Sequence, residues 1–133
     1  MNNYIGEKTL SLIVPGEILP KRNSGMTRVG DGNSLWMQNE AYQKWKTAAR
    51  IWALYSIDSR TFPFKDACKG RVHIYYRGKR PDFEDCLQSI GDCFQGILWF
   101  DEGQIVSWDD SKLIKDNVYP RLDMVIRWQS GNG

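Results

Sequence analysis

The alternation of apolar and polar residues predicts four strands. Residues 9–14 (TLSLIV) are apolar and β-branched, and they are followed by Pro15 and Gly16, which is typical of a strand that ends in a turn. Comparable runs occur at residues 71–77 (RVHIYYR), 104–108 (QIVSW) and 122–128 (LDMVIRW). No apolar run approaches the ~20 residues that a membrane span needs.

Two further segments have the spacing of amphipathic helices. In residues 38–57, Asn39 is a suitable N-cap, and the apolar positions at helical spacing are Tyr42, Trp45, Ala49, Trp52 and Ala53. In residues 82–95, the apolar face comprises Phe83, Leu87, Ile90 and Phe94. Pro81 suits the start of this second helix and Gly96 its end.

The order β-α-β-α-β-β predicts one small α/β (α+β) domain over residues 1–133, with both helices packed on a mixed sheet. A chain of 133 residues suits a single domain, and 13% aromatic residues argue against disorder. The cysteines Cys68, Cys86 and Cys93 lack CxxC spacing, so we expect small buried residues and neither a disulfide framework nor a zinc site. With no signal-peptide pattern at the N-terminus, we expect a soluble cytoplasmic protein.

The net charge of +2 and the pI of about 8.4 are too weak to indicate nucleic-acid binding by themselves. Residues 21–34 (KRNSGMTRVGDGNS) are predicted to form a loop, and its cations Lys21, Arg22 and Arg28 either contact a DNA backbone or are merely solvated. A basic turn with Lys79 and Arg80 precedes the second helix. Cations of the first helix, Lys44, Lys46 and Arg50, form either a solvated surface or part of a phosphate-binding face.

Carboxylates gather around the second helix. Asp82, Glu84 and Asp85 lie at its start, while Asp101 and Glu102 follow the apolar run ILWF and precede Gly103. Acidic residues at a helix N-terminus are favoured by the macrodipole, so capping and solvation are one interpretation. The other is a metal site: carboxylates brought together by an α-β hairpin repel one another unless a cation neutralises them. Magnesium prefers such oxygen ligands and can activate water for phosphodiester hydrolysis.

Residues 81–108 (PDFEDCLQSIGDCFQGILWFDEGQIVSW) resemble the RusA family of Holliday-junction resolvases. The positions that match the family pattern are Pro81, Asp82, Glu84, Asp85, Asp92, Trp99, Asp101, Glu102, Gln104, Ile105 and Val106. The segments LSLIVPGEILPKRNS and AYQKWKTAAR also fall where the family has its first strand, loop and first helix. The resemblance covers most of the chain.

The resemblance implies a homodimeric endonuclease that depends on Mg²⁺, with Mn²⁺ as a substitute, and that makes symmetric nicks in four-way or branched DNA. It implies a bacterial source, often a phage or prophage, and neither a membrane nor a small-molecule cofactor. Carried over by position, the catalytic metal ligands are Asp82, Glu84 and Glu102, with Asp101 as an alternate. The candidate DNA-binding residues are Lys21, Arg22, Arg28, Lys79, Arg80 and Gln88.

The chain departs from the family pattern at four positions. Glutamate replaces aspartate at Glu84 and Glu102, and Asp85 stands where the family has asparagine. Gln88 replaces a lysine, so it can hydrogen-bond a phosphate but supplies no charge; Lys79, Arg80 and Lys112 are candidate replacements. Two alternatives therefore stay open: a weakened member that binds junctions without efficient cleavage, and a protein-interaction domain whose acidic cluster is only surface charge.

Overall fold

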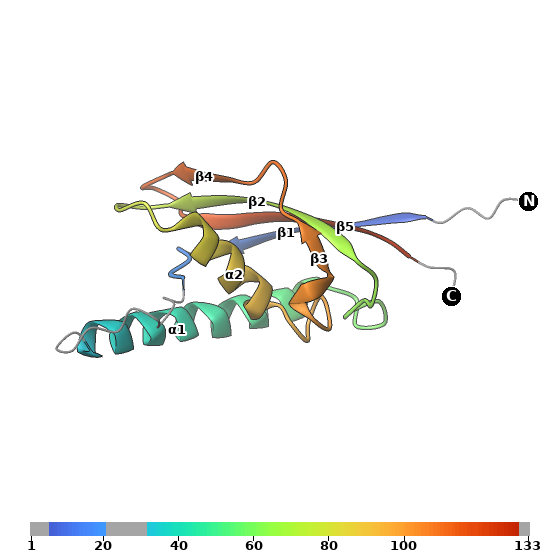
Figure 1. The fold of residues 1–133 in the computed structure, drawn as a ribbon, viewed down its shortest axis with the longest axis horizontal. Helices are drawn as coiled ribbons and strands as arrows, with labels where there is room; N and C mark the ends of the chain where they lie inside the picture. Colours follow the sequence, from blue (N-terminus) through green and yellow to red (C-terminus); the bar gives the residue numbers. More distant parts are fainter. Residues whose placement is uncertain (1–5, 21–31, 131–133) are drawn as a thin grey trace, which may run out of the picture.

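A five-stranded mixed sheet forms one layer of the molecule, and two helices cover one of its faces (Figure 1). The computed structural model describes residues 6–20 and 32–130, and the side chains of residues 32–39 lie outside this description. The elements in chain order are β1 (Glu7–Pro15), α1 (Gly32–Ser56), β2 (Cys68–Tyr76), α2 (Phe83–Cys93), the 3₁₀ turn η2 (Glu102–Gln104), β3 (Ile105–Ser107), β4 (Lys112–Lys115) and β5 (Arg121–Gln129).

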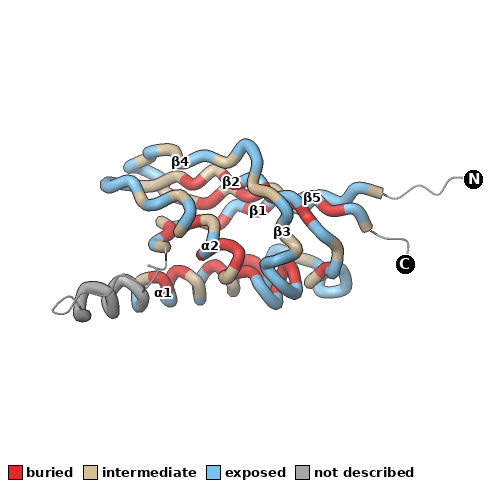
Figure 2. The backbone as a smooth tube through the Cα atoms, viewed as in Figure 1, coloured by how far each residue is buried: buried red, intermediate tan, exposed pale blue. Residues whose placement is uncertain are grey.

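The C-terminal strand β5 lies in the middle of the sheet. It pairs antiparallel with β1 on one side and with β2 on the other. The short strands β3 and β4 both pair parallel with β2, along successive parts of its length. Because side chains alternate between the two faces of a strand, β5 directs Leu122, Met124, Ile126 and Trp128 to the helix-covered face, where all four are buried (Figure 2).

The core lies between this face of the sheet and the two helices. From α1 it receives Tyr42, Trp45, Ala49 and Ala53, all buried as predicted. Trp52 was predicted to join them and does not, since 47% of its surface is exposed. Adjacent helical residues point about 100° apart. Because Ala53 points into the core, its neighbour Trp52 points away from it.

The predicted fold class and element order are confirmed, with one strand added. The prediction missed β4, whose sequence KLIK is too short for a visible alternation. The first helix begins at Gly32, so residues 32–34 of the predicted loop are helical; the rest of that loop within 21–31, with Lys21, Arg22 and Arg28, lies outside the described residues. All three cysteines are buried thiols without disulfides, as expected. Among the described helices, none is both long and apolar enough to cross a membrane.

Candidate active site

The N-terminus of α2 is capped by Asp82. Its Oδ1 accepts a hydrogen bond of 2.9 Å from the backbone N–H of Asp85, and its backbone is extended, as an N-cap requires. The capping interpretation therefore applies to Asp82. Together with Asp85, it lines a depression of about 670 Å³ that also includes Lys79 and Arg80. The predicted carboxylate and two predicted DNA-binding cations are thus neighbours.

Asp101 has a similar capping role in the turn after α2. Its Oδ1 accepts a 3.2 Å hydrogen bond from the N–H of Gly103. Gln104 closes the same turn, because its Oε1 accepts from the N–H of Asp101 while its Nε2 donates to the carbonyl oxygens of Phe64 and Asp66, each at 2.9 Å. These bonds fix the turn that carries Glu102.

Glu102 reaches back from this turn onto α2. Its N–H donates to Oε1 of Gln95 at 2.9 Å, and its carboxylate lies against the helix at Gly91. A Cβ atom at position 91 would stand only 2.9 Å from Oε2 of Glu102 and 3.4 Å from its Cβ. A glycine on α2 therefore leaves the space that this carboxylate occupies.

A cleft of about 640 Å³ opens between α2 and the turn. Three carboxylates line it: Glu84 and Asp92 from α2, and Glu102 from η2. Gln88 and Trp108 are part of the same wall. The structure thus brings the predicted residues Glu84 and Glu102 to one cleft, whereas Asp82 lines the neighbouring depression and Asp101 caps the turn.

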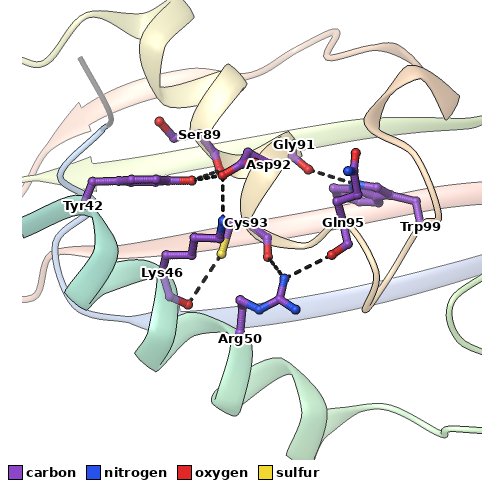
Figure 3. A network of polar contacts seen from close by, with 9 residues as sticks. All are labelled: Tyr42, Lys46, Arg50, Ser89, Gly91, Asp92, Cys93, Gln95 and Trp99. Atoms are coloured by element: carbon purple, nitrogen blue, oxygen red, sulfur yellow. Dashed lines mark hydrogen bonds and ion pairs between the residues drawn. The ribbon is translucent and has the colours of Figure 1, made fainter. Parts of the chain in front are cut away.

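Asp92 links α2 to α1 at the edge of the cleft (Figure 3). Its Oδ2 accepts a hydrogen bond from the Tyr42 hydroxyl and another of 2.9 Å from Nζ of Lys46. Burial raises the pKa of Tyr42 far above its ordinary value, and the bond to Asp92 raises it further. The phenol therefore remains a hydrogen-bond donor across the working pH range.

Arg50 makes a second connection between the helices (Figure 3). Its Nη1 donates to the carbonyl oxygens of Cys93 at 2.8 Å and Gln95 at 3.0 Å. A cation at a helix C-terminus satisfies unpaired carbonyls and complements the macrodipole. Lys46 and Arg50 thus have internal partners, a role that neither sequence interpretation included. A buried tyrosine hydroxyl needs a partner, and this was the only sequence signal for the Tyr42–Asp92 contact.

The donor chemistry of the cleft suits a hard cation. Oxygen is the preferred ligand of magnesium, which commonly takes one or two carboxylates, keeps several waters and binds substrate phosphates. Glu84 and Glu102 meet this requirement. In the part of the chain that the structure describes, no three acidic, histidine or cysteine side chains converge to enclose an ion, so a metal held here would depend on water and phosphate for its other ligands.

The predicted DNA-binding residues are spread over different surfaces. Lys79 and Arg80 are exposed beside Asp82, and Gln88 is exposed in the cleft wall. Lys112 pairs with His73 across β4 and β2, on the face of the sheet that the helices leave open. It is therefore not placed to supply the charge that Gln88 lacks.

Comparison with known proteins agrees with the motifs of residues 81–108. The sequence pattern of the family described as Endodeoxyribonuclease RusA matches residues 15–127, which includes both helices, the strands β2, β3 and β4 and most of β5, but only the last residue of β1. Among curated proteins, none gives a significant match. The family match confirms the resemblance seen in the sequence and covers most of the chain, which therefore belongs to the RusA endodeoxyribonuclease family of DNA hydrolases.

Proposed function

We propose that this protein is a magnesium-dependent endonuclease that resolves four-way or branched DNA by paired nicks. The observation that carries the proposal is that Glu84 and Glu102 line the same cleft, within a chain of a nuclease family. The two residues come from separate elements and occupy acidic positions of the family motif, with glutamate in place of aspartate. With DNA as its substrate, the protein is expected to act in the cytoplasm of a bacterial or phage-infected cell.

Glu84 and Glu102 are the proposed ligands for Mg²⁺, or for Mn²⁺ in its place, and Asp82 and Asp101 remain further candidates. When bound, such an ion lowers the pKa of a water ligand and stabilises the charge that develops on the scissile phosphate. The fold of the protein sets the positions of these carboxylates. The η2 turn, held by Gln104, sets Glu102 against Gly91, and α2 presents Glu84 from the same side as Gln88.

We assign to Lys46 the positive charge that the family motif would have placed at position 88. Lys46 belongs to α1, and its Nζ lies 2.9 Å from Oδ2 of Asp92 in the cleft wall, with 23% of its side chain exposed. A lysine at this position can attract the phosphate backbone toward the cleft, although it is on α1 and the family lysine would be on α2. Gln88 is then left to hydrogen-bond a phosphate oxygen.

Cleavage of a synthetic four-way junction tests the proposal. We expect nicking with Mg²⁺ and none with EDTA, and we expect Glu102→Gln to abolish nicking while it still shifts the junction in a gel. Glu40→Gln, which removes an exposed carboxylate of α1, is the matched control and should cleave like the wild type. Wild-type rates in Glu102→Gln would remove this residue from the site.

The second candidate function is junction binding without efficient cutting. The observation that favours it is Gln88, an uncharged residue in the cleft wall. A gel shift of the junction by the wild type, with no nicking at saturating Mg²⁺ or Mn²⁺, would support this alternative and overturn the nuclease proposal. The absence of any junction affinity at modest salt would instead favour a protein-interaction role.

A further inference from the structure

The sheet has a second face, opposite the helices, that no described element covers (Figure 1). Strand alternation assigns its residues directly. On β2, Cys68, Gly70, Val72 and Ile74 are buried toward the helices, so the residues between them point the other way. Three of these outward residues are basic or imidazole side chains, namely Lys69, Arg71 and His73.

The register between strands extends this basic surface sideways. Lys69 is directly opposite Arg127 of β5, and both are exposed. His73 is opposite Lys112 of β4. Lys69, Arg71, Arg127 and Lys112 thus form a cationic surface across three neighbouring strands, which we call the outer basic face.

The outer basic face has little internal compensation. Within the described residues, Lys69, Arg71 and Arg127 take part in no ion pair. Asp123 of β5 is directly opposite His73 on this face, and its carboxylate is bonded to Arg121 at 3.2 Å. Asp109 and Asp110 line the same groove as Lys69 and Arg127 but stay beyond ion-pair distance from them.

Like charges directly opposite on neighbouring strands destabilise a sheet. Lys69 and Arg127 are such a pair, and an anionic partner would offset that cost. A second copy of the chain is a poor occupant, because it would bring an identical cationic face into contact. A phosphate backbone has the complementary charge, and the repeated spacing of its phosphates suits cations placed along a strand.

We propose that the outer basic face binds the phosphate backbone of a second DNA arm, on the side of the molecule away from the cleft. The inference rests on the proposed function for the identity of the nucleic acid. A branched substrate has several arms diverging from one point, so a nuclease that holds one arm at the cleft can contact another across its sheet. Such contact would favour branched DNA over a simple duplex.

The salt dependence of binding tests this proposal. The variant carries Lys69→Gln, Arg71→Gln and Arg127→Gln, and its affinity for a labelled four-way junction is measured by fluorescence anisotropy in EDTA over a range of salt. Each lost phosphate contact lowers the slope of log K against log salt by about 0.9. We expect the slope to fall by roughly 2 to 3, while the affinity for linear duplex changes less.

The matched control carries Lys8→Gln, Arg60→Gln and Lys65→Gln, three exposed cations elsewhere on the protein. Both variants remove three positive charges from the formal net charge of +2, so overall charge is equal between them. The control should retain the wild-type slope. The single variant Arg127→Gln, expected to lower the slope by about one, provides the same test with less disturbance to the sheet.

The outcomes separate this inference from the proposed function. If the wild type cuts junctions but the outer-face variant keeps its slope, or loses no more than the control, the inference fails and the nuclease proposal stands. If the wild type neither binds nor cuts branched DNA, the proposed function fails first. A change of oligomeric state in the variant, seen by sedimentation, would assign the face to a contact between copies and overturn the inference.

Discussion

At the scale of single residues, Asp92 is one of the points where the two helices meet in polar contact, beside the bond of Arg50 to Cys93. One oxygen of its carboxylate accepts from both the Tyr42 hydroxyl and the Lys46 ammonium group. Tyr42 is fully buried, whereas Lys46 remains partly exposed. The helix α1 therefore holds the Asp92 carboxylate in place in the cleft wall. Among its described side chains, α1 itself has no acidic residue of the candidate site.

Removing the hydroxyl of Tyr42 should destabilise the fold without altering its packing. Tyr42→Phe retains the ring but deprives Asp92 of one donor, and the loss of one such hydrogen bond costs about 0.5–3 kcal/mol of unfolding free energy. Urea denaturation followed by circular dichroism measures the change. Tyr55→Phe, at a position on the same helix with 89% exposure, should leave stability unchanged. Equal effects from the two variants would show that the buried hydrogen bond contributes nothing measurable to the free energy of unfolding.

Filling the space at Gly91 should separate activity from stability. Gly91→Ala places a methyl group 2.9 Å from Oε2 of Glu102, so the glutamate has to move. Alanine is about 1 kcal/mol better than glycine in a helix interior, so we expect the same or higher stability. Cleavage should fall by roughly 10- to 100-fold, as misplaced site groups commonly cause. Undiminished cleavage by Gly91→Ala would contradict this mechanism.

Only part of this residue-level picture was predictable from the sequence. Glu84 and Glu102 could be singled out as candidates because the motif fixes their spacing, with Glu84 in the first turn of α2 and Glu102 in the turn that follows the helix. The ion pair of Lys46 with Asp92 could not, since it depends on how two distant helices cross. Gly91 gave no signal either, because a glycine in a helix is explained only by the side chain that lies over it.

At the scale of elements, α2 combines a structural cap and a proposed ligand in Asp82. Two substitutions separate these roles. Asparagine caps a helix as well as aspartate, whereas alanine costs about 0.5–2 kcal/mol. We expect Asp82→Asn to fold with unchanged stability but to lose cleavage and keep junction binding, and Asp82→Ala to lose both stability and cleavage. Full cleavage by Asp82→Asn would leave Asp82 with its capping role alone.

The elements themselves followed from periodicity wherever one face was buried. The long strands β2 and β5 alternate clearly, and α2 shows one apolar stripe, so their positions were predictable. The placement of β5 between β1 and β2 was not, because strand order depends on contacts between distant segments. The short strand β4 escaped prediction for a related reason: its pairing with β2 creates it, and its own sequence carries little pattern.

At the scale of the whole molecule, the common core protects all three cysteines. Burial raises the pKa of Cys68 to about 11 and that of Cys86 and Cys93 to about 12, and for Cys86 the nearby charges of Asp85 and Asp82 add to the effect. The folded thiols stay protonated where unfolded thiols ionise, near pH 9. Stability from this source is therefore complete below about pH 9 and declines as pH rises toward 11–12.

A thiol-reactive reagent at pH 8 tests whether the three thiols are protected by burial. The native protein should react negligibly, and all three cysteines should react once urea unfolds the chain. Absorbance of the released thiolate product gives the count. A cysteine that reacts rapidly in the native protein would show that the core opens locally around it.

The paired nicking that we propose is a prediction at the scale of the whole molecule. The described part of the chain has one cleft lined by both Glu84 and Glu102, and two symmetric cuts need two such sites related by a twofold axis. We therefore expect a homodimer by sedimentation at micromolar concentration. On a supercoiled plasmid with an extruded cruciform, the wild type should yield linear DNA directly, because both strands are cut within one encounter.

Mixing active and inactive chains makes this expectation testable. With a large excess of Glu102→Gln chains, most active protomers are paired with an inactive partner, so each encounter cuts one strand and the product should shift from linear DNA to nicked circles. The same excess of Glu40→Gln chains should leave linear DNA as the product. If the wild type alone gives mainly nicked circles, or if the mixture changes only the rate, the two strands are cut by independent protomers and the dimeric mechanism is wrong.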